Sequence, residues 1–121
     1  MKDLWFVLLL QNGMTLDRAG LPVEFEDGYL VSLDKYGTKL PVVALTPELF
    51  ELLLENYCFI AETLWRSEDT PHYVGVWVHD SFVYIDINRW FEDRDEALEF
   101  ARENGQLAVW DCANKREIWV E

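Results

Sequence analysis

Between Tyr73 and Asn88, aliphatic residues alternate strictly with residues of other kinds. If Asp80 and Ser81 form a two-residue turn, residue 79 pairs with 82, 78 with 83, 76 with 85 and 74 with 87. One face of this hairpin is then aliphatic: Val74, Val76, Val78, Val83, Ile85 and Ile87. The other face carries Tyr73, Gly75, Trp77, His79, Phe82, Tyr84, Asp86 and Asn88. A period of two fixes the register, because sliding by one residue would expose the aliphatic face.

A first helix is predicted to begin after Thr46, which can serve as its N-cap. Pro47 follows at the first helical position and Glu48 lies in the first turn, both favourable there. The apolar stripe that follows predicts a helix over about 47–57 or longer. The same spacing continues to residue 66, although Tyr57 to Ile60 would also suit a strand or a second short helix.

A second helix is predicted over 94–104. Asp93 is a favourable N-cap, Glu96 follows three residues later as in a capping box, and Gly105 suits the residue that ends the helix. Its buried stripe is Ala97, Leu98, Phe100 and Ala101.

The remaining apolar runs predict further strands. Leu4 to Leu10 is read as a buried strand that turns at Asn12-Gly13, which gives a hairpin near 4–17. A second β segment is expected over Val23 to Leu33, a loop over 34–39, and a C-terminal hairpin near 106–120. Together these elements predict one α+β domain over residues 1–121. Its mainly antiparallel sheet has about five to seven strands, and both helices pack on its aliphatic face.

Charge narrows the choice of partner. The 121 residues include 23 acidic and 10 basic ones, a net charge of −13, with nine acids and four bases up to residue 60 and fourteen and six after it. Such a chain is repelled by nucleic acid and anionic lipid, so we expect no direct binding to either, and a protein with a basic surface as partner. The Leu4–Leu10 run is too short to span a bilayer and precedes no cleavage site. We therefore expect a cytoplasmic protein.

Candidate chemistry is sparse. Cys58, His72, His79 and Cys112 lack the close ligand pairs of structural zinc sites, so no metal or cofactor is expected. A Cys112–His79 nucleophile pair carries no local sign of activation. Asp86 is the best single carboxylate for acid/base work, although anchoring a neighbouring loop or helix end is the commoner role for such a residue. No catalytic residue is assigned.

Two groups of residues are predicted to bind a partner. The first is the aromatic face of the central hairpin, Tyr73, Trp77, Phe82 and Tyr84, since Trp and Tyr dominate interface hot spots. The second is the run of carboxylates at Glu92, Asp93, Asp95, Glu96, Glu99 and Glu103, which could imitate a phosphate array and attract a basic cleft. Glu62, Glu68 and Asp69 could lie near it. The competing interpretation of the aromatic face is that another layer of the domain covers it. The competing interpretation of the acidic helix is that its charges only keep the protein in solution.

Residues 84–120 also resemble a pattern in uncharacterised small acidic proteins of tailed bacteriophages, especially those that infect actinobacteria. The matching features are Tyr84-Ile85-Asp86, the helix over 97–104, residues 106–111 and Glu117-Ile118, whereas Lys115 stands where a turn glycine is more usual. The resemblance implies a phage accessory protein in the host cytoplasm and no active site. We expect a non-enzymatic factor that binds and inhibits a basic, nucleic-acid-handling host protein. The alternatives are a virion or assembly protein that self-associates, an immunity protein, and a small hydrolase using Asp86 and His79. The binding factor itself can be a monomer or a homodimer.

Overall fold

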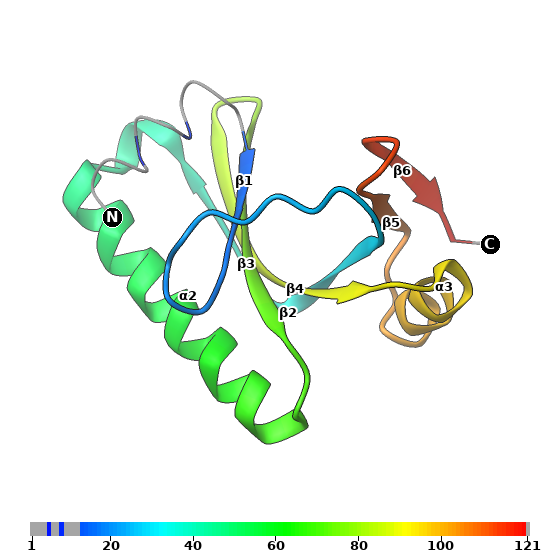
Figure 1. Ribbon diagram of the computed structural model, residues 1–121. Coiled ribbons are helices and arrows are strands. Elements are labelled where there is room, and N and C mark those ends of the chain that lie inside the picture. Colours follow the sequence, from blue (N-terminus) through cyan, green and yellow to red (C-terminus); the bar gives the residue numbers. More distant parts are fainter. Residues whose placement is uncertain (1–4, 6–7, 9–12, 121) are drawn as a thin grey trace.

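One antiparallel sheet organises the protein (Figure 1). The computed structural model describes residues 5, 8 and 13–120, apart from the side chain of Asp34. The strands are β1 (Gly13–Leu16), β2 (Tyr29–Pro41), β3 (His72–His79), β4 (Phe82–Phe91), β5 (Ala108–Asp111) and β6 (Arg116–Trp119), in the order β1-β3-β4-β2-β5-β6. The helices are α2 (Pro47–Glu68) and α3 (Arg94–Glu103), with a short 3-10 helix η1 (Val42–Ala44) before α2. The predicted α+β class is confirmed.

The β3–β4 hairpin has the predicted register. His79 pairs with Phe82, and the pairing continues through Val76 with Ile85 to Val74 with Ile87. Asp80 and Ser81 both have positive φ angles, 50° and 68°, as a type I′ turn requires. The aliphatic face is almost entirely buried, so burial fixes which way this hairpin faces.

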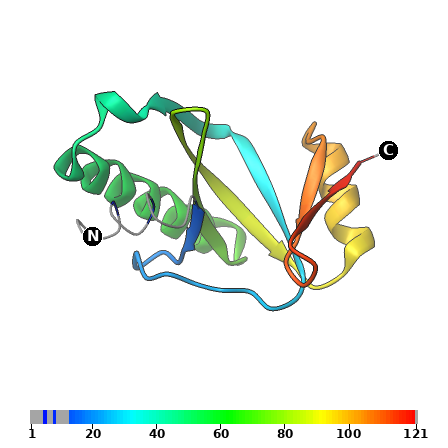
Figure 2. The same cartoon turned by 90° about the horizontal axis from the view of Figure 1, so that it is seen from above.

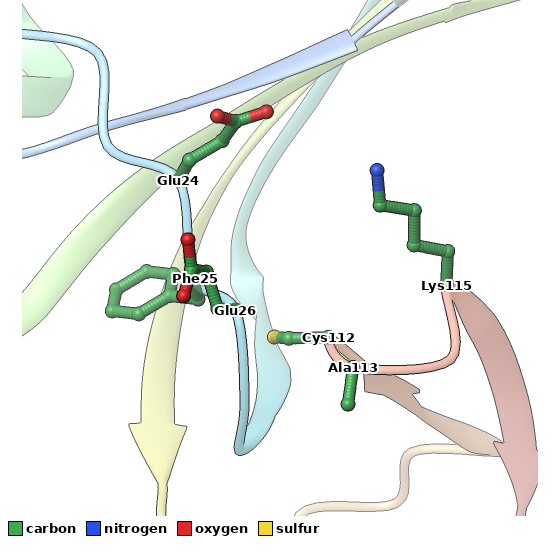
Figure 3. Close-up of a pocket in the computed structure, with 6 residues that line it drawn as sticks. All are labelled: Glu24, Phe25, Glu26, Cys112, Ala113 and Lys115. Carbon is green, nitrogen blue, oxygen red and sulfur yellow. The ribbon is translucent and has the colours of Figure 1, made fainter.

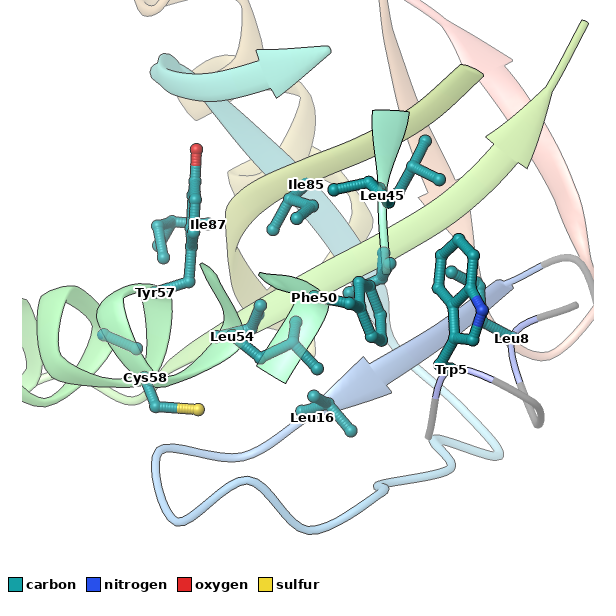
Figure 4. Close-up of a cluster of buried hydrophobic side chains, with 14 of the residues drawn as sticks. Trp5, Leu8, Leu16, Leu45, Phe50, Leu54, Tyr57, Cys58, Ile85 and Ile87 are labelled. Carbon is teal, nitrogen blue, oxygen red and sulfur yellow. The ribbon is translucent and has the colours of Figure 1, made fainter. Parts of the chain in front are cut away.

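Helix α2 is a single helix that runs past residue 57 to Glu68. The Thr46 hydroxyl oxygen accepts a hydrogen bond from the amide of Leu49 (3.1 Å), which confirms the predicted cap. Phe50, Leu54 and Tyr57 face the sheet and pack in the main core, together with Trp5 and Leu8 (Figure 4). Burying Phe50 and Leu54 completely contributes about 1.5–3 kcal/mol each. None of the described helices is both long and apolar enough to cross a membrane.

Helix α3 packs at the opposite end of the sheet from α2 (Figure 2). Asp93 accepts a hydrogen bond from the amide of Glu96 (3.1 Å), and the amide of Gln106 donates to the carbonyl of Ala101 (2.8 Å) after Gly105 at φ 71°. Ala97 and Ala101 form a second, smaller core with Val31 and Val109. Val31 pairs with Arg89, which lies two residues after Ile87 and so on the same face of the sheet. Because α3 packs on Val31, both helices lie on the aliphatic side of the sheet, as predicted.

Three strand predictions need correction. Residues 34–39 are not a loop, because β2 continues to Pro41 through a register shift between Leu33 and Thr38. The Tyr57 hydroxyl bonds with Thr38 and with the carbonyl of Tyr36, which ties this irregular part of β2 to α2. Residues 23–25 form no strand; beside β1 there is an isolated bridge between Pro22 and Leu16, and the amide of Val23 donates to the carbonyl of Thr15.

The expected hairpin near 4–17 lies largely outside the described residues. Trp5 and Leu8, which are described, have helical backbone and are buried, so the predicted strand is wrong at these two positions. The described part, β1, pairs with β3. Strand β1 was predicted to pair with a strand before Asn12, and β3 is its partner instead.

The segment between β1 and β2 crosses the sheet face opposite the helices, which we call the open face. Phe25 stacks on Trp90 (ring centroids 5.7 Å apart, planes at 15°) and meets Tyr73 edge-on (5.0 Å). The indole of Trp90 donates a hydrogen bond to the carbonyl of Asp27 (2.9 Å) and lies directly on Gly28. These contacts fix the segment across one half of the open face.

Gly28→Ala should destabilise the protein by at least twice as much as Gly105→Ala. Both glycines have positive φ angles (80° and 71°). Holding alanine in this conformation costs about 1 kcal/mol of stability at either position. At Gly28 a Cβ would lie 2.3 Å from the Trp90 ring, whereas nothing lies within 4 Å at Gly105, so only Gly28 adds an overpacking cost of about 1–3 kcal/mol. Urea unfolding of both variants measures the difference, and equal losses would contradict the packing.

Candidate protein-binding surface

The aromatic residues predicted to bind a partner divide into a covered part and an exposed part. Tyr73 lies beneath Phe25 and beside Trp65, and this burial raises the pKa of its hydroxyl, with a further contribution from Asp17. Trp77 is 43% exposed and stacks on Tyr84 with centroids 4.2 Å apart. Phe82 and Tyr84 lie on the same face and share the Lys39 ammonium, which lies 4.3 Å and 5.5 Å from their ring centroids. The exposed Trp77 and the half-buried Phe82 and Tyr84 therefore gather near the Asp80–Ser81 turn, and we call these three residues the Trp77 cluster.

Polar side chains fill the open face between these two aromatic groups. The Ser32 hydroxyl lies 2.6 Å from Asp86 Oδ2 and 3.0 Å from Asn88 Oδ1, and can donate to one of them at a time. Asp86 and Asn88 also occupy the space above Gly75, where a Cβ would lie 2.3 Å from Asn88 Nδ2 and 2.5 Å from Asp86 Oδ1. Asp86 thus takes part in a cross-strand polar network, in line with the anchoring role.

The residues named for a hydrolase do not meet. His79 lies four residues along β3 from Gly75, the partner of Asp86, which corresponds to about 13 Å. The Trp77–Tyr84 pair stands between them. Desolvation by burial, then nearby carboxylates, raises the pKa of both Cys58 and Cys112 to about 11, which keeps each as a neutral thiol at pH 7.

Metal ligands are also dispersed. No group of three His, Cys, Asp or Glu side chains in the described part of the chain could hold a metal ion. His72 is fully buried, with Nδ1 2.7 Å from the Thr70 carbonyl and Nε2 3.0 Å from the Glu68 carboxylate. It joins the end of α2 to the start of β3.

The predicted acidic surface lies on and beside α3, and its side chains are exposed. The residues are Glu92, Asp93, Asp95, Glu96, Glu99 and Glu103. Within the described residues none of the six forms an ion pair, whereas on α2 Glu62 pairs with Arg18 and Arg66. Six acidic and two basic residues give a net charge of −4 over the twelve residues 92–103, while α2 has five acidic and one basic, −4 over 22. Negative charge is therefore about twice as dense along residues 92–103 as along α2, and the difference comes from Glu92 and Asp93, which precede α3.

The structure separates the two predicted groups. Phe91, at the end of β4, is seven residues after Tyr84, so Tyr84 is about 23 Å along the strand from the end that leads to α3. Glu62, Glu68 and Asp69 belong to α2 and its end, away from α3 (Figure 1). The acidic helix therefore cannot use the central aromatic cluster as an adjoining hydrophobic centre.

Other exposed apolar residues lie closer to α3 than the central aromatic residues do. Leu107, Trp110 and Trp119 are 75%, 41% and 65% exposed, and all lie in the last hairpin or next to it. We call α3, β5 and β6 the C-terminal unit. These three residues are not among those predicted to bind a partner. The signal was present in the alternation of the last hairpin, because Val109 and Ile118 point toward α3 and thus turn Trp110 and Trp119 outward.

The turn between β5 and β6 is held by Asp111. Its carboxylate accepts hydrogen bonds from the amides of Ala113 (3.1 Å) and Asn114 (3.2 Å) and from the Asn114 side chain (2.8 Å). Lys115, where the sequence favours glycine, has φ 52° and adopts the left-handed conformation. The turn also forms one wall of an open pocket of about 320 Å³, opposite Glu24 and Glu26, and the Cys112 thiol points toward that segment (Figure 3). The hairpin that displays Trp110 and Trp119 is therefore rigidly closed.

Asp111→Asn should destabilise the protein more at pH 7 than at pH 3. The hydrogen bond from the Asn114 side chain, assisted by two amides and Arg116, lowers the pKa of Asp111. A lowered folded-state pKa stabilises the protein above the unfolded value near 3.9, and this contribution is lost as pH falls through the folded-state value. Urea unfolding at both pH values measures this, with Asn114→Ala as a variant that should weaken the pH dependence. An equal loss at the two pH values would contradict it.

Comparison with known proteins does not place the chain in a family. No family model matches the chain, and no curated protein or solved structure matches it significantly.

Proposed function

We propose that this protein is a non-enzymatic binding protein that engages a basic surface of a partner protein through the acidic face of α3. The observation that carries the proposal is a set of six exposed carboxylates on and beside α3, none of which forms an ion pair with another described residue. Each of the six carboxylates attracts a positively charged surface that approaches this face. The attraction also speeds association, and salt weakens it, because exposed charges are screened beyond about 8 Å at physiological ionic strength.

The spacing of the carboxylates supports binding over mere solubility. Asp95, Glu99 and Glu103 follow one another at four-residue intervals, so they form a row on one side of α3 with a rise of about 6 Å per step. Like charges at this spacing destabilise a helix by about 0.2–0.5 kcal/mol per pair. A basic partner would relieve that repulsion, to which Arg102, three residues after Glu99, already adds one opposing positive charge.

The more specific form of the proposal follows the phage resemblance of residues 84–120. The protein is then a phage accessory factor in the host cytoplasm that occupies the basic cleft of a nucleic-acid-handling host protein and inhibits it. A second candidate, a self-associating assembly component, draws on different features: the exposed Trp119, and the outer edge of β6, which pairs with no other described strand. Salt distinguishes the two, since apolar self-association does not weaken as ionic strength rises.

Reversing charge on α3 should abolish capture of the partner. The test is affinity capture from host lysate with wild type and with Glu96, Glu99 and Glu103 all changed to Lys, at about 50 and 500 mM salt. A matched control changes Glu48, Glu51 and Glu55 of α2 to Lys, which alters net charge by the same amount elsewhere. We expect a basic protein to be retained by wild type and by the α2 variant at low salt, lost at high salt, and lost in the α3 variant.

Two results would contradict the proposal. Equal loss in both charge variants would show that net charge alone governs binding, with no special role for α3. Retention of the same partner by the α3 variant would remove this face from the interface. Dispersed amide NMR spectra of both variants would show that each is folded before capture is compared.

A further inference from the structure

Strand β6 ends the sheet, and its outer edge has no neighbour among the described residues. The amide of Val120 donates to the carbonyl of Leu107 (2.8 Å), which marks residues 120 and 107 as a hydrogen-bonded pair. Bonded pairs alternate in an antiparallel ladder, so Ile118 bonds inward to Val109. The N–H and C=O groups of Glu117 and Trp119 therefore point outward from the sheet.

The other edges of the sheet are closed or protected. Beside β1, the amide of Val23 donates to the carbonyl of Thr15 (2.8 Å), and Pro22 bridges to Leu16, so the following segment occupies that edge. Beyond Leu30 the outer edge of β2 is interrupted by its register shift and carries Lys35 and Lys39. Natural sheets use irregularity and lysine in this way to prevent pairing. Strand β6 has no register shift.

An apolar surface adjoins this edge. Trp119 pairs with Ala108, and Trp110 pairs with Glu117, so both tryptophans project from the same side of the hairpin, away from α3. A strand added along β6 would place alternate side chains beside Trp119, in the position of a cross-strand neighbour. Backbone hydrogen bonds would then give affinity, and the tryptophan would provide a desolvated centre.

Charge selects the occupant of this edge. Residues 92–103 have a net charge of −4, whereas residues 104–120 have two acidic and two basic residues, and the chain as a whole has a net charge of −13. A second copy would bring another −13 against this end, which electrostatic repulsion disfavours. In a segment that alternates Lys or Arg with apolar residues, the cations can lie on the α3 side of the sheet and the apolar residues beside the exposed tryptophan.

We propose that β6 is a docking edge that accepts an extended basic segment of the partner as an added strand, with Trp119 at the centre of the contact. This inference rests on the proposed function, because it takes the partner to be basic. It assigns the hydrophobic centre to the C-terminal unit and not to the Trp77 cluster. The acidic face of α3 then attracts the partner, and the β6 edge fixes its position.

The test uses a defined probe, an eight-residue peptide of alternating lysine and valine, titrated into isotopically labelled protein and followed by NMR. Glu117→Pro removes one outward N–H without removing a bond to β5, as an edge position tolerates. Glu117→Ala is the matched control that keeps this N–H. We expect amide shifts at Glu117 and Trp119, affinity at least about tenfold weaker in Glu117→Pro and in Trp119→Ala, and affinity within about threefold of wild type in Glu117→Ala.

A second probe keeps the test valid if Glu117→Pro does not fold. The same peptide, N-methylated at alternate residues, keeps every charge but cannot pair with a strand edge, and it should bind wild type at least about tenfold more weakly. Equal binding of the methylated and unmethylated peptides would overturn the inference. So would shifts confined to α3.

Further outcomes separate this inference from the proposed function. If the α3 charge variant loses the host partner while Glu117→Pro retains it at full affinity, the proposed function stands and strand docking fails. If wild type dimerises with rising concentration and Glu117→Pro does not, the edge belongs to a second copy, and the inference is overturned. If both variants lose the partner and Glu117→Ala keeps it, both proposals are supported.

Discussion

The aliphatic face of the β3–β4 hairpin is the constraint on which the rest of the structure depends. Its six Val and Ile residues must be removed from water, and the two-residue turn permits only one register that places them together. Helix α2 covers most of this face, and β1 and β2 pair on either side of the hairpin. Because the helices share the aliphatic side, the opposite face must be covered by loops or remain in contact with solvent.

That one-sided packing explains where recognition can occur. The segment carrying Phe25 covers half of the open face, and Gly28 is what lets Trp90 approach its backbone. The carboxylates of α3 cannot enter the small core beneath them, where only Ala97 and Ala101 fit fully. They therefore stay in solvent at the end of the sheet, next to its open edge at β6. Exposed carboxylates, exposed tryptophans and outward-pointing backbone groups thus occur together in the C-terminal unit.

Local signals predicted the parts of the fold that local physics decides. The Thr46 and Asp93 caps and the hairpin register follow from a few neighbouring residues each. The path of β2 through 34–39 could not be predicted in this way, because polar residues join a strand there through pairing with β4 and the hydroxyl of Tyr57. The candidate surface was also predicted only in part. The helix pattern predicted that the α3 carboxylates are exposed. The separation of Trp77 from α3 depends on the length of β4 and the order of the strands, which no single segment encodes.

The central claim is that negative potential is concentrated at α3 and not spread evenly over a molecule of charge −13. The most direct measurement is the near-surface potential at each amide, obtained by NMR from the relaxation that cationic and anionic paramagnetic cosolutes cause. The account predicts that amides of residues 92–103 experience a more negative potential than exposed amides of α2. Potentials that are equal along the two helices, or more negative at α2, would contradict it.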